Sequence, residues 1–166
     1  MTEIDGARLD TAARTCVRHA ERMQSAIDSL RAVMPMGGPE LQQLTDEDVR
    51  ALDQFVYRFG KLQDAAGTQL FPALLAALEE PYREWSVRDR LNRLEQLGIL
   101  SALDDWEAIR AIRNRLTHEY PDDAERQAAI LDEAWTLAPV LFRIIHMVIA
   151  GAEQRLARRL PNITFV

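Results

Sequence analysis

The segment that decides the fold is residues 109–121, which read IRAIRNRLTHEYP. Ile109, Ile112 and Leu116 recur at helical spacing, so this segment has one apolar face with arginines beside it. Pro121 disfavours helical geometry at the residue before it. The segment therefore predicts the end of an amphipathic helix, and such a helix buries its apolar face against other parts of the protein.

The same segment carries side chains suited to chemistry on a phosphate group. Arg113 can hold a phosphate through two parallel charge-assisted hydrogen bonds. Histidine can both accept and donate a proton near neutral pH, and His118 follows in the same segment. Together the two residues predict a centre that acts on a phosphodiester of RNA without a metal ion.

Helical geometry limits how these two side chains can meet. At about 100° per residue, His118 falls roughly 140° away from Arg113 on an unbroken helix, whereas Arg110 lies on the same side as Arg113. Two arrangements would bring Arg113 and His118 to one phosphate. The helix can unwind near Thr117, or a two-fold dimer can place the arginine of one chain opposite the histidine of the other. The sequence therefore predicts a homodimer in which dimerisation is part of the mechanism.

The spacing of arginine, four residues, histidine, one residue and tyrosine resembles the HEPN superfamily, and within it the HepT-like ribonuclease toxins. The residues that carry this resemblance are Arg113, Asn114, His118 and Tyr120. A looser likeness extends over about residues 45 to 150, and includes FGKLQD at 59–64, LFP at 70–72 and LEQLGIL at 94–100.

The resemblance implies an all-α, HEPN-like fold and a metal-independent endoribonuclease toxin that needs no cofactor. It implies catalytic roles for Arg113 and His118, with Asn114 in support. Arg110 is a second supporting candidate because of its place beside Arg113 on the helical wheel. It also implies a cognate nucleotidyltransferase antitoxin as partner. In the family, the tyrosine that matches Tyr120 is the position to which that partner attaches AMP, which silences the toxin.

Each of these residues also has a plainer interpretation. Basic residues near a helix C-terminus interact favourably with the last carbonyls, by about 0.3–1 kcal/mol each, so Arg113 and His118 can simply stabilise the helix end. Asn114 is equally suited to donating to a phosphate and to orienting His118. Tyr120 can be a packing residue with a hydrated hydroxyl. The rival function is a non-catalytic helical module that binds a nucleotidyltransferase or a nucleotide.

The rest of the chain predicts an up-and-down all-α bundle of four or five helices in a single domain over residues 1–166, with a core over 7–158. The sequence shows no strand alternation and no repeat. The first predicted helix spans 6–34, and the second begins after the N-cap Thr45 and bends or breaks around Gly67 and Pro72. The third runs from the N-cap Ser86 to Leu97, and the fourth begins at a capping box formed by Ser101 and Asp104. The fifth begins at Asp122 and Asp123 and runs to Ala150 or Arg159, with an interruption near Pro139. The segment 35–39 is the clearest break, and 161–166 is expected to be an extended tail.

Composition narrows the classes of function. The chain has 166 residues, a net charge of -6 and a single cysteine, Cys16, which fits a reducing cytoplasm and excludes an internal disulfide framework. The N-terminus lacks the features of a signal peptide, and we expect no membrane span. The acidic charge argues against broad nonspecific binding of nucleic acid, although it leaves room for a local basic cleft. Lys61 is the only lysine.

Other candidates are weaker. His19 and His146 lie on apolar helices and are interpreted as core or flanking residues. No spacing of His, Cys, Asp and Glu matches a zinc or calcium site. Arg155, Arg158 and Arg159 form a basic patch that is equally explained as a solvated helix end, and the three tryptophans are expected in the core.

Overall fold

The computed structural model describes residues 2–100, 103–118 and 122–165, and every regular element in those ranges is helical. The all-α bundle predicted from the sequence is confirmed. The helices are α1 (Glu3–Leu30), α2 (Gly38–Leu41), α3 (Asp46–Ala65), η1 (Ala66–Leu70), α4 (Phe71–Ala77), η2 (Tyr82–Glu84), α5 (Val87–Gln96), α6 (Leu103–Leu116) and α7 (Ala124–Leu156).

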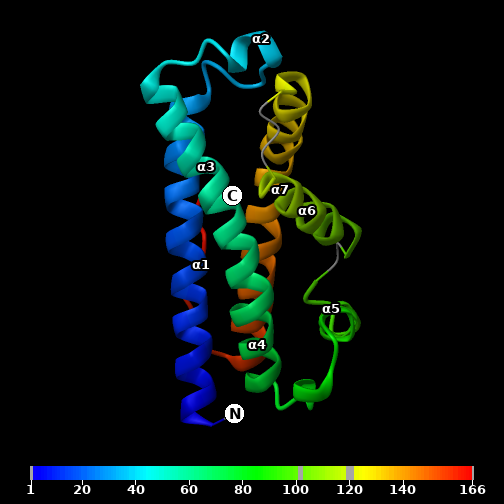
Figure 1. The fold of residues 1–166 in the computed structure, drawn as a ribbon. Helices are drawn as coiled ribbons and strands as arrows, with labels where there is room; N and C mark the ends of the chain where they lie inside the picture. The colour runs from blue at the N-terminus through cyan, green and yellow to red at the C-terminus, as the bar shows by residue number, and fades with distance from the viewer. Residues whose placement is uncertain (1, 101–102, 119–121, 166) are drawn as a thin grey trace.

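Three long columns form the body of the bundle. α1 lies beside α3 in the opposite direction, α4 continues the column of α3, and α7 runs behind them (Figure 1). α6 contacts both α3 and α7 and extends obliquely outward from them, toward the shorter α5 at one side (Figure 1). α6 therefore has its apolar face against the bundle and its C-terminal end close to α3.

Local capping sets the starts of α3, α5 and α7. Thr45 and Ser86 each form a capping box, in which their side chains accept from the backbone N–H of Asp48 and Asp89. Asp123 caps α7 by accepting from the backbone N–H of Arg126. These three predicted starts are confirmed. The capping box predicted at Ser101 lies outside the described residues.

The chain remains helical past Gly67 and Pro72, where we expected a bend or break. Over Ala66–Leu70 the backbone becomes a π-helix, and the N–H of Phe71 bonds to the carbonyl of Ala66. Pro72 has no N–H to donate, and a π turn lets the backbone change its bonding pattern without ending the helix. The expected interruption is therefore a change of helical type.

Several other boundaries differ from the sequence-based expectation. α1 begins at Glu3 and ends at Leu30, so it starts and stops earlier than the predicted 6–34. The short helix α2 was not predicted, and it packs on α7, where the backbone N–H of Met36 donates to Asp132 at 3.1 Å. α7 continues as one helix past Pro139 and ends where Ala157 adopts left-handed backbone angles.

The composition of α7 reflects its position in the core. Twelve of its residues are buried, and a window of this helix has a mean hydropathy of 1.6 with 44% of that window buried inside the fold. By length and composition this helix could cross a bilayer, which the sequence analysis did not anticipate. The core helix of a bundle can pass the same test, and one such helix is weak evidence for a membrane span.

Candidate functional site

α6 places the motif because its apolar residues anchor it in the core. Trp106, Ile109 and Ile112 are buried, and the Trp106 ring lies against Phe71 with 4.8 Å between ring centroids. A side chain on Gly67 would meet the same indole at 3.4 Å, so the tryptophan fits closely against the π-helical segment. This packing fixes the rotation of α6 and turns Arg113 toward α3.

α6 ends within the motif, as one of the two sequence-based arrangements requires. Its last residue is Leu116, and the N–H groups of Thr117 and His118 bond to the carbonyls of Asn114 and Arg115, three residues earlier. The chain therefore leaves helical geometry at Thr117. His118 consequently departs from the direction that an unbroken helix would give it.

Arg113 is held by two contacts. Its Nη2 donates to Oδ2 of Asp64 at 2.7 Å, and its Nη1 donates to Oδ1 of Asn114 at 3.1 Å. The side chains of Arg113 and Asp64 are 32% and 39% exposed, so the pair is accessible to solvent and contributes less than about 1 kcal/mol to stability. Asp64 thus positions the guanidinium while leaving it within reach of an anion.

The observed contacts of Arg113 and Asn114 bear on the alternatives left open by the sequence. The guanidinium bonds to two side chains, and no bond to a terminal carbonyl of α6 is recorded among the described residues. The amide oxygen of Asn114 orients Arg113, a role that the sequence analysis did not consider. Its amide nitrogen has no recorded partner in the described part of the chain.

Arg113 and His118 lie in two adjoining hollows between α3 and the ends of α6 and α7. The hollow that contains Arg113 has a volume of about 230 Å³. The hollow that contains the exposed His118 has a volume of about 370 Å³. Both hollows are lined by Val56, Tyr57 and Leu116. The two motif residues therefore share one face of the molecule, although they do not converge within one hollow of a single chain.

The remaining motif residues are placed less directly. Arg110 is exposed, with no hydrogen bond or ion pair recorded within the described ranges. Tyr120 lies outside the described residues, and so does the proline that follows it. The structure therefore brings Arg113, Asn114 and His118 to one face and leaves the tyrosine untested.

Tyr57 is the residue of this face that the sequence analysis missed. It lines both hollows and is 55% exposed, which is high for an aromatic side chain. The guanidinium of Arg58 and the ammonium of Lys61 lie 5.1 and 5.5 Å from the centre of its ring. The sequence alone does not show that this ring is exposed, because its exposure depends on how α3 packs against α6.

His19 interacts with the same part of α3. Its Nδ1 lies 3.0 Å from Nη1 of Arg58, which requires the imidazole to accept a hydrogen bond from the guanidinium. Burial, followed by the positive charge of Arg58 and Lys61, lowers the pKa of His19. Its side chain is half-buried at a flank of the bundle, as expected, and is held neutral by its surroundings.

This arrangement predicts that stability falls as the pH is lowered from 7.5 toward 5. His19 takes up a proton more readily in the unfolded chain, whose histidine pKa is about 6.5, than in the folded protein. Protonation also opposes the bond from Arg58. His19→Gln keeps an acceptor without titrating, so urea denaturation at several pH values should show a shallower loss for this variant. An identical pH dependence in both proteins would contradict this explanation.

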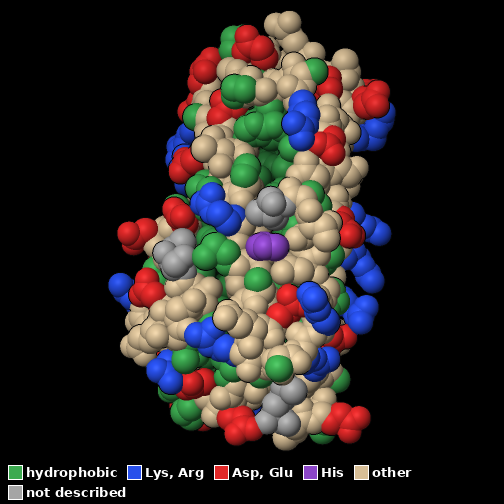
Figure 2. Space-filling view, turned by 180° about the vertical axis from the view of Figure 1, so that it is seen from behind, with side chains coloured by type: hydrophobic (Ala, Val, Ile, Leu, Met, Phe, Trp, Pro, Cys, Tyr) green, Lys and Arg blue, Asp and Glu red, His purple; other side chains and the backbone are tan. Residues whose placement is uncertain are grey.

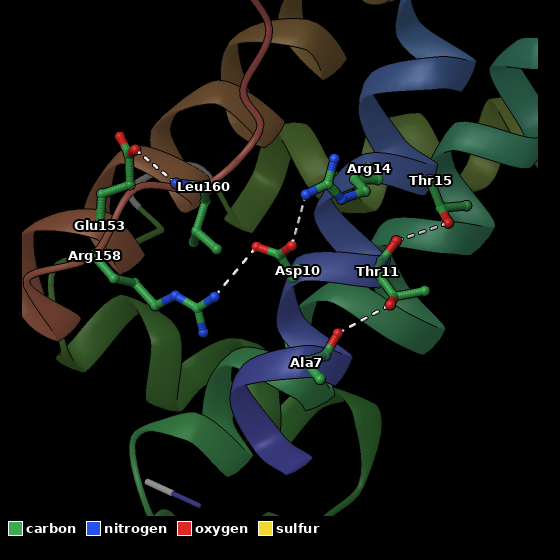
Figure 3. Close-up of polar contacts among 8 residues, drawn as sticks. All are labelled: Ala7, Asp10, Thr11, Arg14, Thr15, Glu153, Arg158 and Leu160. Carbon is green, nitrogen blue, oxygen red and sulfur yellow. Dashed lines mark hydrogen bonds and ion pairs between the residues drawn. The ribbon is translucent and has the colours of Figure 1, made fainter. Parts of the chain in front are cut away.

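Two of the basic residues near the C-terminus, Arg155 and Arg158, make contacts within the fold, and Arg155 donates to the backbone carbonyl of Leu97. Arg158 lies 3.4 Å from Asp10 of α1, and Arg14 holds the same carboxylate at 2.9 Å (Figure 3). Glu153 accepts from the backbone N–H of Leu160 at 2.9 Å (Figure 3). His146 likewise contacts the carbonyl of Ile163 at 3.0 Å. These contacts fasten residues 157–165 to α1 and α7, which favours the structural interpretation of His146 and of the patch.

Two other hollows, of about 550 and 540 Å³, contain no motif residue. The first lies between α1, α7 and the C-terminal segment. Figure 2 shows this side of the molecule, where hydrophobic side chains gather around a hollow in the upper half of the view. Its lining residues are Gln24, Ile27, Arg31, Trp135, Pro139, Phe142, Arg143 and Phe165.

Metal ligands and nucleophiles are sparse in the described ranges. No group of three or more His, Cys, Asp or Glu side chains is placed to hold a metal ion there. Cys16 is buried in α1, and burial raises the pKa of its thiol to about 12, so the thiolate is not populated near neutral pH. The ionisable side chains that line the two hollows are Asp53, Tyr57, Lys61, Asp64, Arg113, Arg115 and His118.

Comparison with known proteins found no matching family model, no matching curated protein and no matching solved structure.

Proposed function

We propose that this protein is a metal-independent endoribonuclease toxin that cleaves RNA by attack of a ribose 2′-hydroxyl. The observation that carries the proposal is the end of α6 at Leu116, which leaves Arg113 and His118 in adjoining hollows of one face. The contact with Asp64 supports it further, because a positioned guanidinium stabilises charge that develops on a phosphate. The expected setting is the cytoplasm.

The reaction assigned to this site needs one base, one acid and one stabilising cation. A neutral imidazole of His118 removes the proton of the 2′-hydroxyl, and the 2′-oxygen forms a bond to the adjacent phosphorus. Arg113 stabilises the negative charge on the phosphorane oxygens. The bond from phosphorus to the 5′-oxygen breaks, and a protonated histidine supplies a proton to that oxygen. The products are a 2′,3′-cyclic phosphate and a 5′-hydroxyl.

The second histidine is expected to come from a second copy of the chain. A single chain has one His118, so the histidine that acts as the acid would come from the second chain of a two-fold dimer. In one chain the hollow of His118 is separate from that of Arg113, and a dimer would bring the arginine of one chain closer to the histidine of the other. Sedimentation velocity at micromolar concentration should therefore show a dimer whose interface includes α6. A monomer at that concentration, or a dimer with the two motifs on opposite outer surfaces, would contradict this prediction.

A nucleotidyltransferase antitoxin is expected to inhibit the protein through Tyr120. AMP attached there would add a bulky group and a negative charge close to the motif, and Arg113 could then bind the modification in place of an RNA phosphate. Tyr120→Phe should keep nuclease activity and escape inhibition by such a partner. Mass spectrometry after co-expression with a candidate nucleotidyltransferase tests this, and adenylate on a different residue would refute it.

Expression of the chain alone in a bacterial host tests the toxin assignment. The wild type should arrest growth and should reduce intact RNA, whereas His118→Ala should permit normal growth at the same protein level. Equal growth of the two strains, with the protein soluble and abundant in both, would refute the assignment.

One hollow favours a second candidate function, the binding of a nucleotide. Trp135, Phe142 and Phe165 line the hollow of about 550 Å³ and could stack on a base. Arg143 lines it as well and has no ion pair recorded in the described ranges, so it could bind a phosphate. Titration of a fluorescent ATP analogue, followed by anisotropy, should then show binding that Arg143→Gln weakens. No binding at millimolar protein would remove this candidate.

A further inference from the structure

A row of basic side chains adjoins the face that carries the motif. Arg58 and Lys61 project from α3 next to Tyr57, and His19 joins this group from α1 through its contact with Arg58. Arg18 and Arg22, one helical turn apart, are close enough to lower the pKa of His19 by their charge. Two helices therefore contribute four cations to one region, which we call the basic surface: Arg18, Arg22, Arg58 and Lys61. Arg58 is the half-buried member, and the other three are exposed.

The charges of the basic surface are not neutralised by the carboxylates nearby. No ion pair of Arg18, Arg22, Arg58 or Lys61 with a carboxylate is recorded among the residues that the structure describes. The nearby Asp64 pairs with Arg113, and Asp10 pairs with Arg14 and Arg158. Figure 2 shows Lys and Arg side chains following one another along the edge of the molecule that α1 forms. These four cations are therefore left without an ion-pair partner in the described ranges, in a chain whose net charge is -6.

Tyr57 gives the basic surface a second property. Its ring is 55% exposed and lies close to two cations, so it presents an accessible aromatic group beside the hollows of Arg113 and His118. Aromatic side chains flanked by cations bind single-stranded nucleic acids, because a base stacks on the ring while the cations contact the phosphates. In a duplex, the bases are already stacked and paired, and the ring could not reach a free base face.

We propose that the basic surface and Tyr57 bind single-stranded RNA and lead it to the motif. Tyr57 stacks on one base next to the cleaved bond, and the four cations hold the phosphates on one side of it. This inference rests on the proposed function for the identity of the ligand. It adds the residues that select unpaired RNA and the direction, across α3 and α1, in which the bound strand extends.

Binding can be measured without cleavage in a His118→Ala background. A fluorescein-labelled oligoribonucleotide of mixed sequence is titrated with protein, and anisotropy is recorded at several salt concentrations. Tyr57→Ala should weaken binding about 5-fold or more, and Tyr57→Phe, which keeps the ring, should stay within about 2-fold. The pair Arg22→Gln and Lys61→Gln should weaken binding and reduce the slope of log affinity against log salt by about 1 to 2.

A matched control lies on the opposite side of the bundle. Arg88 is an exposed cation on α5, far from α1, and Arg88→Gln should leave RNA affinity unchanged (Figure 1). A duplex of the same sequence should bind at least about 5-fold more weakly, because it offers no free base to stack. Inorganic polyphosphate should respond to the arginine and lysine changes but not to Tyr57→Ala.

The outcomes separate this inference from the proposed function. Variants of Tyr57, Arg22 and Lys61 that bind RNA as tightly as the parent would overturn it, and so would equal affinity for duplex and single strand. If wild-type protein binds as expected but never cleaves RNA, the nuclease proposal fails and the binding surface stands. If RNA is cleaved while these variants keep wild-type KM and affinity, the nuclease stands and the binding surface fails.

Discussion

His118→Ala should lower the rate of RNA cleavage by about 10²–10⁴-fold, the range that general acid–base catalysis contributes. Arg113→Ala should lower it by about 10²–10³-fold, because the guanidinium stabilises charge that is present only as the reaction proceeds. Both side chains lie at the end of α6, and His118 is exposed, so the fold should be retained. Single-turnover cleavage of a labelled RNA at saturating protein measures the two effects.

Arg93 provides a matched control for Arg113. Its Nη2 lies 2.8 Å from Glu80, and its side chain is 36% exposed, so Arg93→Ala removes an ion pair of similar length, although Glu80 is only 15% exposed and accepts from both Nε and Nη2 of Arg93. That variant should cleave at the wild-type rate and should lose a similar small amount of stability. If Arg113→Ala and His118→Ala also cleave at wild-type rates, the residues assigned to catalysis are wrong.

Trp106→Ala should lower the free energy of unfolding by about 3–5 kcal/mol, the usual loss when a large aromatic residue is removed from a core. The indole is 1% exposed, packs against Phe71 and fills the space left by Gly67. Because this contact fixes the rotation of α6, the substitution should also disturb the position of Arg113. Urea denaturation followed by circular dichroism measures the change.

Trp85 serves as the control for that prediction. It is half-buried in the segment between η2 and α5, and no aromatic ring contact is recorded for it in the described ranges. Trp85→Ala should therefore destabilise the protein much less than Trp106→Ala. Equal losses for the two variants, or a loss below about 1 kcal/mol for Trp106→Ala, would contradict the view that Trp106 anchors α6.

The features predicted well from sequence depend on neighbouring residues. The capping residues Thr45, Ser86 and Asp123 act within three positions of themselves, so the sequence indicates them directly. The end of α6 near Thr117 is equally local. Wheel geometry indicated that Arg113 and His118 could approach one phosphate only if the helix ended before His118 or a second chain took part, and α6 does end at Leu116.

The features that sequence could not predict depend on tertiary contacts. Asp64 positions Arg113 across 49 positions of sequence, and no local pattern marks that carboxylate as its partner. Before Pro72 the chain forms a π-helical turn and does not break, and Trp106 packs against this turn. From sequence alone, Tyr57 cannot be distinguished from any other aromatic residue of an amphipathic helix. Its exposure close to two cations depends on how α3 and α6 pack together.

One measurement tests the central claim most directly. Purified protein is incubated with a 5′-labelled single-stranded RNA in a buffer that contains a chelator of divalent metal ions, and the ends of the products are identified. We expect cleavage in the chelator, with 2′,3′-cyclic phosphate and 5′-hydroxyl ends, and loss of this activity in His118→Ala. Absence of cleavage, a requirement for divalent metal, or products with 3′-hydroxyl and 5′-phosphate ends would contradict an Arg113–His118 ribonuclease.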